Sequence, residues 1–276
     1  MVIYIFFFVF LCYNLVGGCM NSLILLVFSV LPVLLIGCYI YYKDSSKEPK
    51  GFIIKLFLCG IGSFVLTIIL SLIISIFYPA LLASDYSAGL IELFFHVFLG
   101  IALVEEFSKW IFVYLFSYNS KHYDQFYDMI IYAVFVSLGF ACIENIFYVF
   151  EHGFSTAIVR ALLSVPGHAC DGIFMGYYLS MAKTSSSKEL SRKYLFMSIL
   201  VPMLLHGFFD FCLFSKMIIF IVLFFIFVIF LYIFSIKKIK KVSAITGKIK
   251  YKDNFCPECG RKVDSDFCPN CGRKNE

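Results

Sequence analysis

Apolar stretches of about 20 residues recur along this 276-residue chain, separated by short segments rich in polar and charged side chains. A run of about 20 apolar residues is long enough to cross a bilayer as an α-helix. The pattern therefore predicts an all-α polytopic membrane protein with about seven to eight spans. The seven clearest spans cover residues 23–42, 52–77, 90–116, 126–150, 157–182, 194–214 and 217–236.

The apolar segment 1–19 leaves three interpretations open: an extra span, a signal peptide, or upstream sequence if Met20 is the true start. It lacks the basic residues with which a signal peptide begins, which weakens the second interpretation. The rest of the chain divides into a transmembrane domain, residues 20–236, a basic juxtamembrane linker, residues 237–252, and a small C-terminal module, residues 253–276.

Basic residues indicate the orientation of the spans. The loops after the first, third, fifth and seventh spans hold almost all loop lysines and arginines, whereas the opposite loops hold only Lys216. Cytoplasmic loops carry such an excess, so the C-terminus is predicted to lie in the cytoplasm and the protein in the cell membrane. With 61% hydrophobic and 15% charged residues the chain is not a soluble domain, and its small net charge of +5 gives no reason to expect nucleic acid as a partner.

Ionisable residues inside the predicted spans are the candidate chemistry, because each unpaired charge at the bilayer centre costs about 2.5–3.5 kcal/mol. In the third span, Glu105 and Lys109 are one helical turn apart and are expected to pair. Glu106 is rotated by about 100° and needs a partner from another helix. The later spans add Glu144, Asn145, Arg160, His168, Asp171, His206 and Asp210.

Two prolines lie close to these residues and predict interrupted helices. Pro166 and Pro202 each remove a helical hydrogen bond shortly before a histidine. Broken helices at membrane depth are tolerated where they line a cavity. At 1.5 Å per residue, Glu144, His206 and His168 lie roughly 9, 12 and 16 Å from the outer ends of their spans, so they can meet in one layer.

Four motifs in this order resemble the PrsW family of intramembrane proteases, which is distantly related to the CAAX prenyl endopeptidases. They are Glu-Glu-x-x-Lys at 105–109, Phe-x-x-x-Glu-Asn at 140–145, Arg160 with Pro-Gly-His at 166–168, and His-x-x-x-Asp at 206–210. The loop from Lys43 to Pro49 is similar to that family's Asp…Glu-Pro segment. The resemblance covers roughly residues 20–214.

The resemblance implies an endopeptidase that cleaves single-pass membrane proteins near the extracytoplasmic side, such as an anti-sigma factor. The expected partners are therefore a single-pass substrate and the lipid bilayer. Carried over by position, the catalytic residues are Glu105, Glu106, Glu144, His168 and His206, and the supporting residues are Lys109, Asn145, Arg160 and Asp210. Asp171 matches no family position, and we expect it to pair with Arg160 or Lys109.

Two mechanisms fit these residues. In the favoured one, Glu105 is a general base for water while His168, His206 and Asn145 stabilise the oxyanion. In the other, the two histidines and a carboxylate bind zinc, although the chain lacks a His-Glu-x-x-His helix. From other classes, an ion- or proton-coupled transporter and a catalytically inactive scaffold remain alternatives. A transporter predicts inverted repeats, and the two halves show no internal similarity.

The C-terminal module contains two Cys-Pro-x-Cys-Gly repeats. Their paired spacing is typical of a tetrahedral four-cysteine zinc site, and the module resembles the small zinc ribbons appended to many prokaryotic membrane proteins. A reduced, metal-bound state agrees with the predicted cytoplasmic position. We therefore expect a structural zinc ion on Cys256, Cys259, Cys268 and Cys271.

Overall fold

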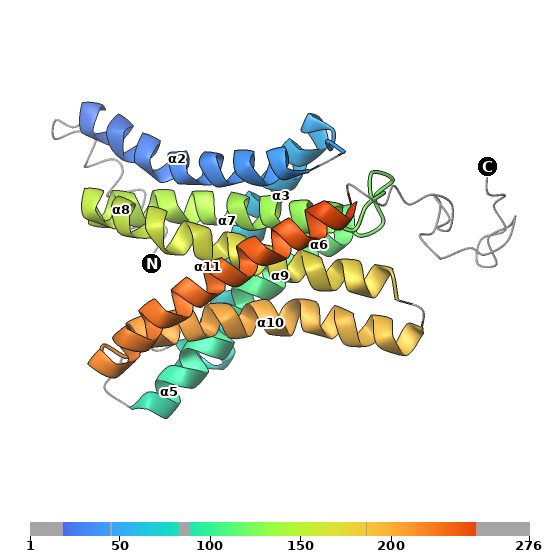
Figure 1. The fold of residues 1–276 in the computed structure, drawn as a ribbon. Coiled ribbons are helices and arrows are strands. Elements are labelled where there is room, and N and C mark those ends of the chain that lie inside the picture. The colour runs from blue at the N-terminus through green and yellow to red at the C-terminus, as the bar shows by residue number, and fades with distance from the viewer. Residues whose placement is uncertain (1–18, 45, 83–88, 186, 247–276) are drawn as a thin grey trace, which may run out of the picture.

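The computed structural model describes residues 19–44, 46–82, 89–185 and 187–246, and these residues form only helices, turns and loops (Figure 1). The predicted zinc ribbon and most of segment 1–19 lie outside the described residues. The helices are α2 (Cys19–Lys43), α3 (Lys50–Phe77), α4 (Pro79–Leu82), α5 (Leu90–Phe95), η2 (His96–Ala102, a π-helix), α6 (Leu103–Ser117), α7 (Asp128–His152), α8 (Phe154–Leu162), α9 (Ser164–Lys183), α10 (Lys188–Phe214) and α11 (Ile218–Thr246).

Each predicted span has a helical counterpart, but two of them are divided. Within the described residues, five helices (α2, α3, α7, α10 and α11) are long and apolar enough to cross a membrane. The third predicted span is α5, η2 and α6 in succession, and the fifth is α8 followed by α9. These two carry Glu105, Glu106, Arg160 and His168. The count of seven to eight spans stays a prediction, because the helices of the two divided segments are too short or too polar to qualify by length and composition.

Helix α7 is the centre of the bundle. In its most apolar stretch of 18 residues, 72% of the residues are buried, against 11–33% in the corresponding stretches of the other four candidate spans. It lies between α2 and α9 in Figure 1, and α3 also packs on it. The α3 and α7 backbones touch at Gly60 and Gly139. A Cβ atom at Gly139 would overlap the carbonyl oxygen of Phe57, and one at Gly60 would overlap that of Val136. Small residues permit this approach, as in other membrane helix pairs.

We expect Gly139→Ala to destabilise the fold by about 1–3 kcal/mol, because the added methyl group overpacks a backbone contact that cannot yield. The measurement is thermal unfolding of the purified protein in detergent. Gly51→Ala is the matched control, since nothing lies within 4 Å of the Cβ position at Gly51. Alanine there should be neutral or slightly stabilising. Equal melting temperatures for Gly139→Ala and wild type would contradict the close crossing of α3 and α7.

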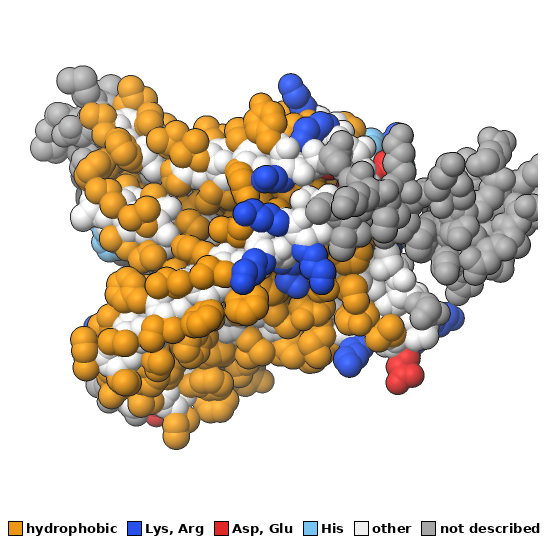
Figure 2. Space-filling model, in the orientation of Figure 1, with side chains coloured by type: hydrophobic (Ala, Val, Ile, Leu, Met, Phe, Trp, Pro, Cys, Tyr) orange, Lys and Arg blue, Asp and Glu red, His pale blue; other side chains and the backbone are white. Residues whose placement is uncertain are grey.

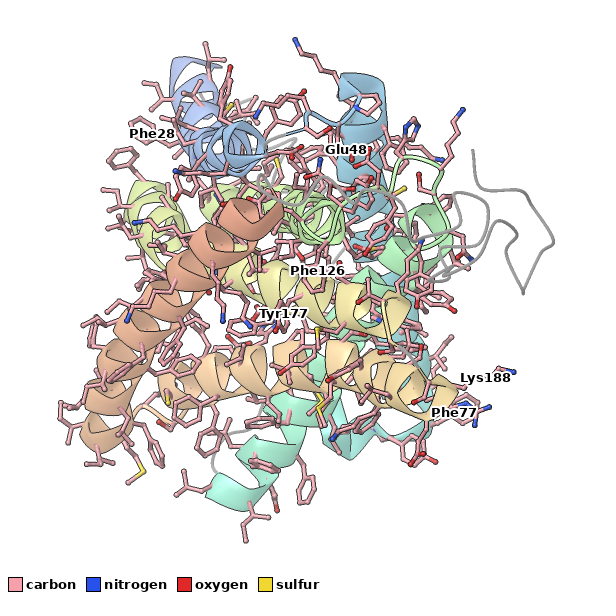
Figure 3. All side chains as sticks on the ribbon, turned by 45° about the vertical axis from the view of Figure 1, so that its right-hand side comes forward. Phe28, Glu48, Phe77, Phe126, Tyr177 and Lys188 are labelled. Atoms are coloured by element: carbon pink, nitrogen blue, oxygen red, sulfur yellow. The ribbon has the colours of Figure 1, made fainter. Side chains whose placement is uncertain are left out.

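The ends of the helices that border the basic loops lie together on the right in Figure 1. Lys183, at the end of α9, donates to the carbonyl oxygen of Tyr118, after α6, and Lys238 of α11 lies 3.4 Å from the ring centroid of Tyr177. Phe126 packs on Tyr177 at the same end (Figure 3). In Figure 2 most lysine and arginine side chains lie at the centre and right, and the left end is mainly hydrophobic. Helix α11 runs to Thr246, so the first part of the predicted linker continues the last span as a helix.

The connection between α2 and α3 buries a carboxyl group at this basic end. Glu48 is 5% exposed, and its Oε2 has no hydrogen-bond partner among the described residues (Figure 3). Burial raises the pKa of Glu48 from 4.5 to about 7; Tyr132 opposes the shift, and Asp124 and Asp44 add to it. The pKa of Asp44 is raised by burial as well.

The raised pKa of Glu48 predicts that the stability of the fold depends on pH. Because the folded state holds the proton more tightly than the unfolded state, stability falls as the pH rises from about 4.5 through about 7. Glu48→Gln should remove up to about 3 kcal/mol of this loss. The measurement is the free energy of unfolding from pH 5 to 8, in which Asp44 and the other buried carboxyl groups leave a residual slope. An unchanged slope in Glu48→Gln would contradict the burial of this carboxyl group.

Candidate active site

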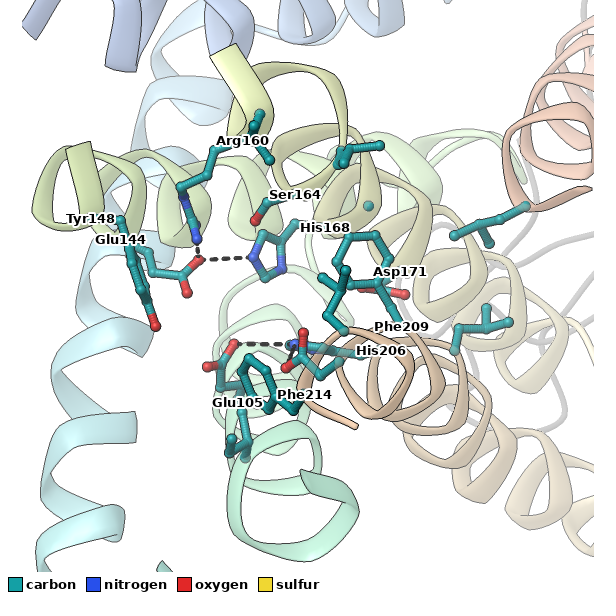
Figure 4. Close-up of a pocket in the computed structure, with 18 residues that line it drawn as sticks. Glu105, Glu144, Tyr148, Arg160, Ser164, His168, Asp171, His206, Phe209 and Phe214 are labelled. Carbon is teal, nitrogen blue, oxygen red and sulfur yellow. Dashed lines mark hydrogen bonds and ion pairs between the residues drawn. The ribbon is translucent and has the colours of Figure 1, made fainter. Parts of the chain in front are cut away.

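The polar residues of the later spans converge on one cavity of about 210 Å³ (Figure 4). Its walls come from η2, α6, α7, α8, α9, α10 and α11, and apolar side chains such as Val159, Leu205 and Phe209 complete them. The polar side chains that line it are Glu105, Glu144, Tyr148, Arg160, Ser164, His168, Asp171, His206 and Asp210.

A break between α8 and α9 places Arg160 and His168 on the same wall. Leu163, at the break, has φ −120° and ψ −62°, and α9 starts again at Ser164. The break lies where Pro166 predicts it, because proline leaves the carbonyl group of Leu162 without a helical partner. Tyr232 of α11 supplies that partner: its hydroxyl donates to Leu162 O at 2.8 Å and to Leu163 O at 3.1 Å. The prediction of a second break was wrong, since α10 continues through Pro202.

The paired glutamates lie in the first turn of α6, which follows directly on the seven-residue π-helix η2. Such segments are rare and often lie at functional sites, because the extra residue per turn changes the direction of the following side chains. Phe98 of η2 packs against Gly207 of α10, where a Cβ atom would come within 2.5 Å of the ring. This contact brings His206 close to Glu105 and Glu106.

Glu106, Lys109 and His206 form one hydrogen-bonded group. Glu106 is fully buried and its Oε1 accepts from Lys109 Nζ at 2.7 Å and from His206 Nδ1 at 2.8 Å. The expected pair of Glu105 and Lys109 is looser, at 3.6 Å. His206 Nε2 lies 3.4 Å from Asp210 Oδ2 and 3.9 Å from Glu105 Oε2. Glu105 is therefore the glutamate that faces the cavity, and Glu106 holds Lys109 and His206 from behind.

A second group is built around Glu144. Its Oε2 accepts from Arg160 Nη2 at 2.7 Å and from His168 Nε2 at 2.9 Å (Figure 4). Arg160 Nε donates to Asn145 Oδ1 at 2.9 Å, and the Asn145 amide donates to Ser29 O of α2 at 2.7 Å. Asn145 is fully buried and does not line the cavity. The structure thus places it behind Arg160, away from the position that an oxyanion donor would need.

His168 joins the two groups. Its Nδ1 lies 3.2 Å from Lys109 Nζ, and its ring meets the His206 ring edge to face at 5.3 Å. The Lys109 ammonium group can only donate, so His168 Nδ1 accepts and its Nε2–H donates to Glu144. The neighbours of this histidine therefore fix one neutral tautomer.

The structure brings together the residues that the motifs single out, with two corrections, Asn145 and Asp171, and two additions. Asp171 was expected to pair with Arg160 or Lys109, but in the described part of the chain those two cations pair with Glu144, Glu105 and Glu106. Asp171 lines the cavity instead, and its Oδ1 is buried without a hydrogen-bond partner in that part. Sequence reasoning missed Tyr148 and Ser164, although Tyr148 is one turn from Glu144 and carries Arg160 over its ring at 4.3 Å.

Two sets of side chains could hold a metal ion. The first set is Glu106, His168, Asp171 and His206, each of which offers one ligand atom within 4.8 Å of the ligand atoms of the others. The second set, by the same measure, is Glu105, Glu144 and His168. In the first set, Glu106 Oε2 and Asp171 Oδ1 are buried acceptors without a hydrogen-bond donor among the described residues. A cation would satisfy both atoms, and histidine with carboxylate oxygen is a donor set that zinc accepts. The two carboxylates therefore fit a metal ion, and His168 would bind it through Nδ1 when the ion takes the place of the Lys109 ammonium group at that nitrogen.

Fold and site together define an integral membrane protein with a polar centre of carboxylates and histidines inside its helical bundle. The family model of the PrsW family intramembrane metalloproteases matches residues 48–235. The chain belongs to the PrsW family of intramembrane proteases.

Curated relatives agree with this assignment. The chain is 40% identical over 185 residues to a protein named Protease PrsW from Oceanobacillus iheyensis, which covers 67% of this chain and 80% of that protein. It is 39% identical over 194 residues to Protease PrsW from Clostridioides difficile (68% and 79%), and 39% identical over 176 residues to Protease PrsW from Bacillus subtilis (63% and 76%). No solved structure matches.

Proposed function

We propose that this protein is an endopeptidase that cuts single-pass membrane proteins close to the extracytoplasmic side, for example a regulator of the anti-sigma-factor type. The observation that carries the proposal is the convergence of Glu105, Glu144, His168 and His206 on one cavity inside the bundle. Glu144 lies eight residues before the end of α7 that is opposite the basic loops, so about 12 Å separate it from that end. A substrate helix would therefore present its outer half to the cavity.

In the proposed reaction Glu105 is the proton acceptor. It lines the cavity, is 13% exposed, and its Oε2 is buried without a hydrogen-bond partner among the described residues. Glu106 is already bound to Lys109 and His206. Water would lose a proton to Glu105 as its oxygen attacks the scissile carbonyl carbon. The protonated Glu105 would then give that proton to the amine nitrogen as the C–N bond breaks.

His206 is the best placed donor to the oxyanion. Its Nδ1–H is bound to Glu106, and its Nε2 side faces the cavity between Glu105 and Asp210. Donation from both nitrogens requires the imidazolium form, which the three surrounding carboxylates favour. Arg160 also lines the cavity and carries more N–H groups than Glu144 and Asn145 use. We therefore propose His206 and Arg160 as oxyanion donors in place of Asn145, which is a positioning residue for Arg160.

The same residues allow a metal-assisted version of this reaction, and the description of the family as metalloproteases supports it. Glu106, His168, Asp171 and His206 would hold the ion. A bound zinc ion would lower the pKa of its water towards 7 and polarise the carbonyl group. Glu105 keeps its role as proton acceptor in both versions, because it lies beside this set without belonging to it.

Metal content separates the two versions, provided that the predicted zinc ribbon is removed from the count. We propose to measure zinc in full-length protein, in the double variant Cys256→Ser and Cys259→Ser, and in that variant with His206→Ala added. One zinc ion that survives the cysteine changes and disappears with His206→Ala would support the metal version. No zinc after the cysteine changes, with cleavage retained, would support the glutamate version and the cytoplasmic ribbon as a separate structural zinc site.

The activity itself is tested by comparing membrane and secreted proteomes of cells that express wild type or Glu105→Gln at equal levels. New protein termini are mapped by mass spectrometry. Cuts near the outer membrane boundary of single-pass proteins, seen only with wild type, would support the proposal and name the substrate. Identical termini with and without envelope stress would favour a transporter or an inactive scaffold.

A further inference from the structure

A second cavity lies on the other side of α7 and is almost entirely apolar. It has a volume of about 300 Å³ and lies between α2 and α3, with Phe135 and Leu138 of α7 as its floor. In Figure 3 helix α3 begins near Glu48, beside the end of α2, and then runs past α7 to Phe77; both helices pack on α7. Leu34 and Ile54, one on each wall, are 55% and 59% exposed. The groove therefore opens towards the surrounding lipid.

The basic end of the groove is positively charged. Lys50 lines the groove directly, and Lys43 and Lys47 lie in the connection beside it. All three are exposed, and none has a carboxylate within 4.0 Å among the described residues. Lys47 Nζ lies 5.7 Å from the ring centroid of Tyr42, which also lines the groove. An anionic group at this end would meet three cations that have no carboxylate partner in the described part of the chain; Lys47 Nζ donates to the carbonyl oxygens of Tyr41 and Asp44.

The dimensions of the groove suit a lipid chain better than a protein helix. On α2 it extends from Val33 to Tyr42, about 14 Å at 1.5 Å per residue. This is about half of the 30 Å hydrocarbon core, the depth of one leaflet. A helix is 10–12 Å wide, so two and a half turns of one would need roughly four to five times the volume of the groove.

We propose that this groove binds one anionic phospholipid of the inner leaflet, with an acyl chain along α2 and α3 and the phosphate group beside Lys50. Basic pockets between membrane helices recognise anionic head groups in this way. The α2 wall of the groove lies before residue 48, where the family match begins, and the groove shares no lining residue with the candidate active site. The lipid would hold α2 against α7, and through Ser29 and Asn145 it would help to position Arg160.

The test uses delipidated full-length protein in detergent, titrated with phosphatidylglycerol or phosphatidylcholine, with bound lipid counted by native mass spectrometry. Wild type should bind one phosphatidylglycerol at least fivefold more tightly than phosphatidylcholine. Lys50→Gln should weaken phosphatidylglycerol binding about fivefold, which corresponds to about 1 kcal/mol per basic side chain. Ile54→Trp, which fills the groove, should abolish this binding.

Two matched variants serve as controls. Lys188→Gln removes an exposed lysine at the start of α10, and Leu58→Trp changes a 58%-exposed side chain one turn beyond the groove. Both should bind lipid as wild type does.

Equal affinity for the two lipids, or unchanged phosphatidylglycerol binding in both groove variants, would overturn the proposal. If Ile54→Trp stopped substrate cleavage while lipid binding was unchanged, the groove would be a substrate-docking site. Lipid binding is measured without cleavage, so it is independent of the proposed activity.

Discussion

Replacing Glu105 by glutamine is expected to lower the cleavage rate by roughly 10²–10⁴, the contribution that a positioned general base makes. Glutamine keeps the size of the side chain and loses only the ability to take a proton. Because Glu105 Oε2 lies 3.6 Å from Lys109 Nζ and 3.9 Å from His206 Nε2, it makes no short hydrogen bond within the described residues whose loss would disturb the fold. The measurement is the turnover of a single-span reporter by purified protein in vesicles.

Glu92→Gln is the matched control for this experiment. Glu92 is an exposed carboxylate in α5, within the same predicted span as Glu105, and it does not line the cavity. Its replacement should leave the rate within about twofold of wild type, and both variants should melt at the wild-type temperature. A Glu105→Gln protein that folds normally and cleaves within threefold of wild type would remove Glu105 from the reaction.

The positions of the helices could be predicted from sequence because the bilayer imposes their lengths. The span predicted at residues 52–77 is α3, Lys50–Phe77, and that predicted at 126–150 is α7, Asp128–His152. The same argument identified the site, since charges that are expensive in lipid must gather where they can pair. Glu105, Glu144, His168 and His206 do meet in one cavity, as their similar depths predicted.

The pairing within the site could not be predicted, because it depends on how each helix is rotated about its axis. Helical spacing favours Glu105 as the partner of Lys109, but the shorter contact is made by Glu106. The π-helix η2 lies just before Glu105 and Glu106, and no simple sequence pattern predicts it. Asp171 and Asn145 differ from expectation for the same reason. The rotation of α9 directs Asp171 into the cavity, and the rotation of α7 directs Asn145 against α2.

The fold also explains how a polar site can remain open in a membrane. The segments that carry the site, η2 with α6 and α8 with α9, are the interrupted ones, whereas the uninterrupted helices α2, α3 and α11 carry long apolar faces exposed to lipid. Backbone groups freed at the α8–α9 break are satisfied by Tyr232 of α11. Irregular backbone at membrane depth is stable only when protein covers it in this way.

Removing the Lys109 ammonium group is expected to cost the most stability, about 3–5 kcal/mol. Lys109 is 0% exposed, binds Glu106 Oε1 at 2.7 Å, and lies 4.1 Å from the Phe140 ring centroid. In Lys109→Met, the equally buried Glu106 loses its nearest cation and, of its partners in the described part of the chain, keeps only His206. Breaking one side of a buried ion pair costs about this much, because the remaining charge stays in a low-dielectric interior. The measurement is the free energy of unfolding in detergent titrated with SDS.

The size of the loss decides what kind of contact joins Glu106 and Lys109. A hydrogen bond between neutral groups in a membrane protein contributes about 0.6 kcal/mol on average, so a loss below about 1 kcal/mol would show that no ion pair is present. Adding Glu106→Leu to Lys109→Met removes the stranded carboxylate and should recover most of the stability. Cleavage should not recover, because His206 would still lack the carboxylate that orients its ring. Recovery of both stability and cleavage would show that the buried pair only holds the helices together.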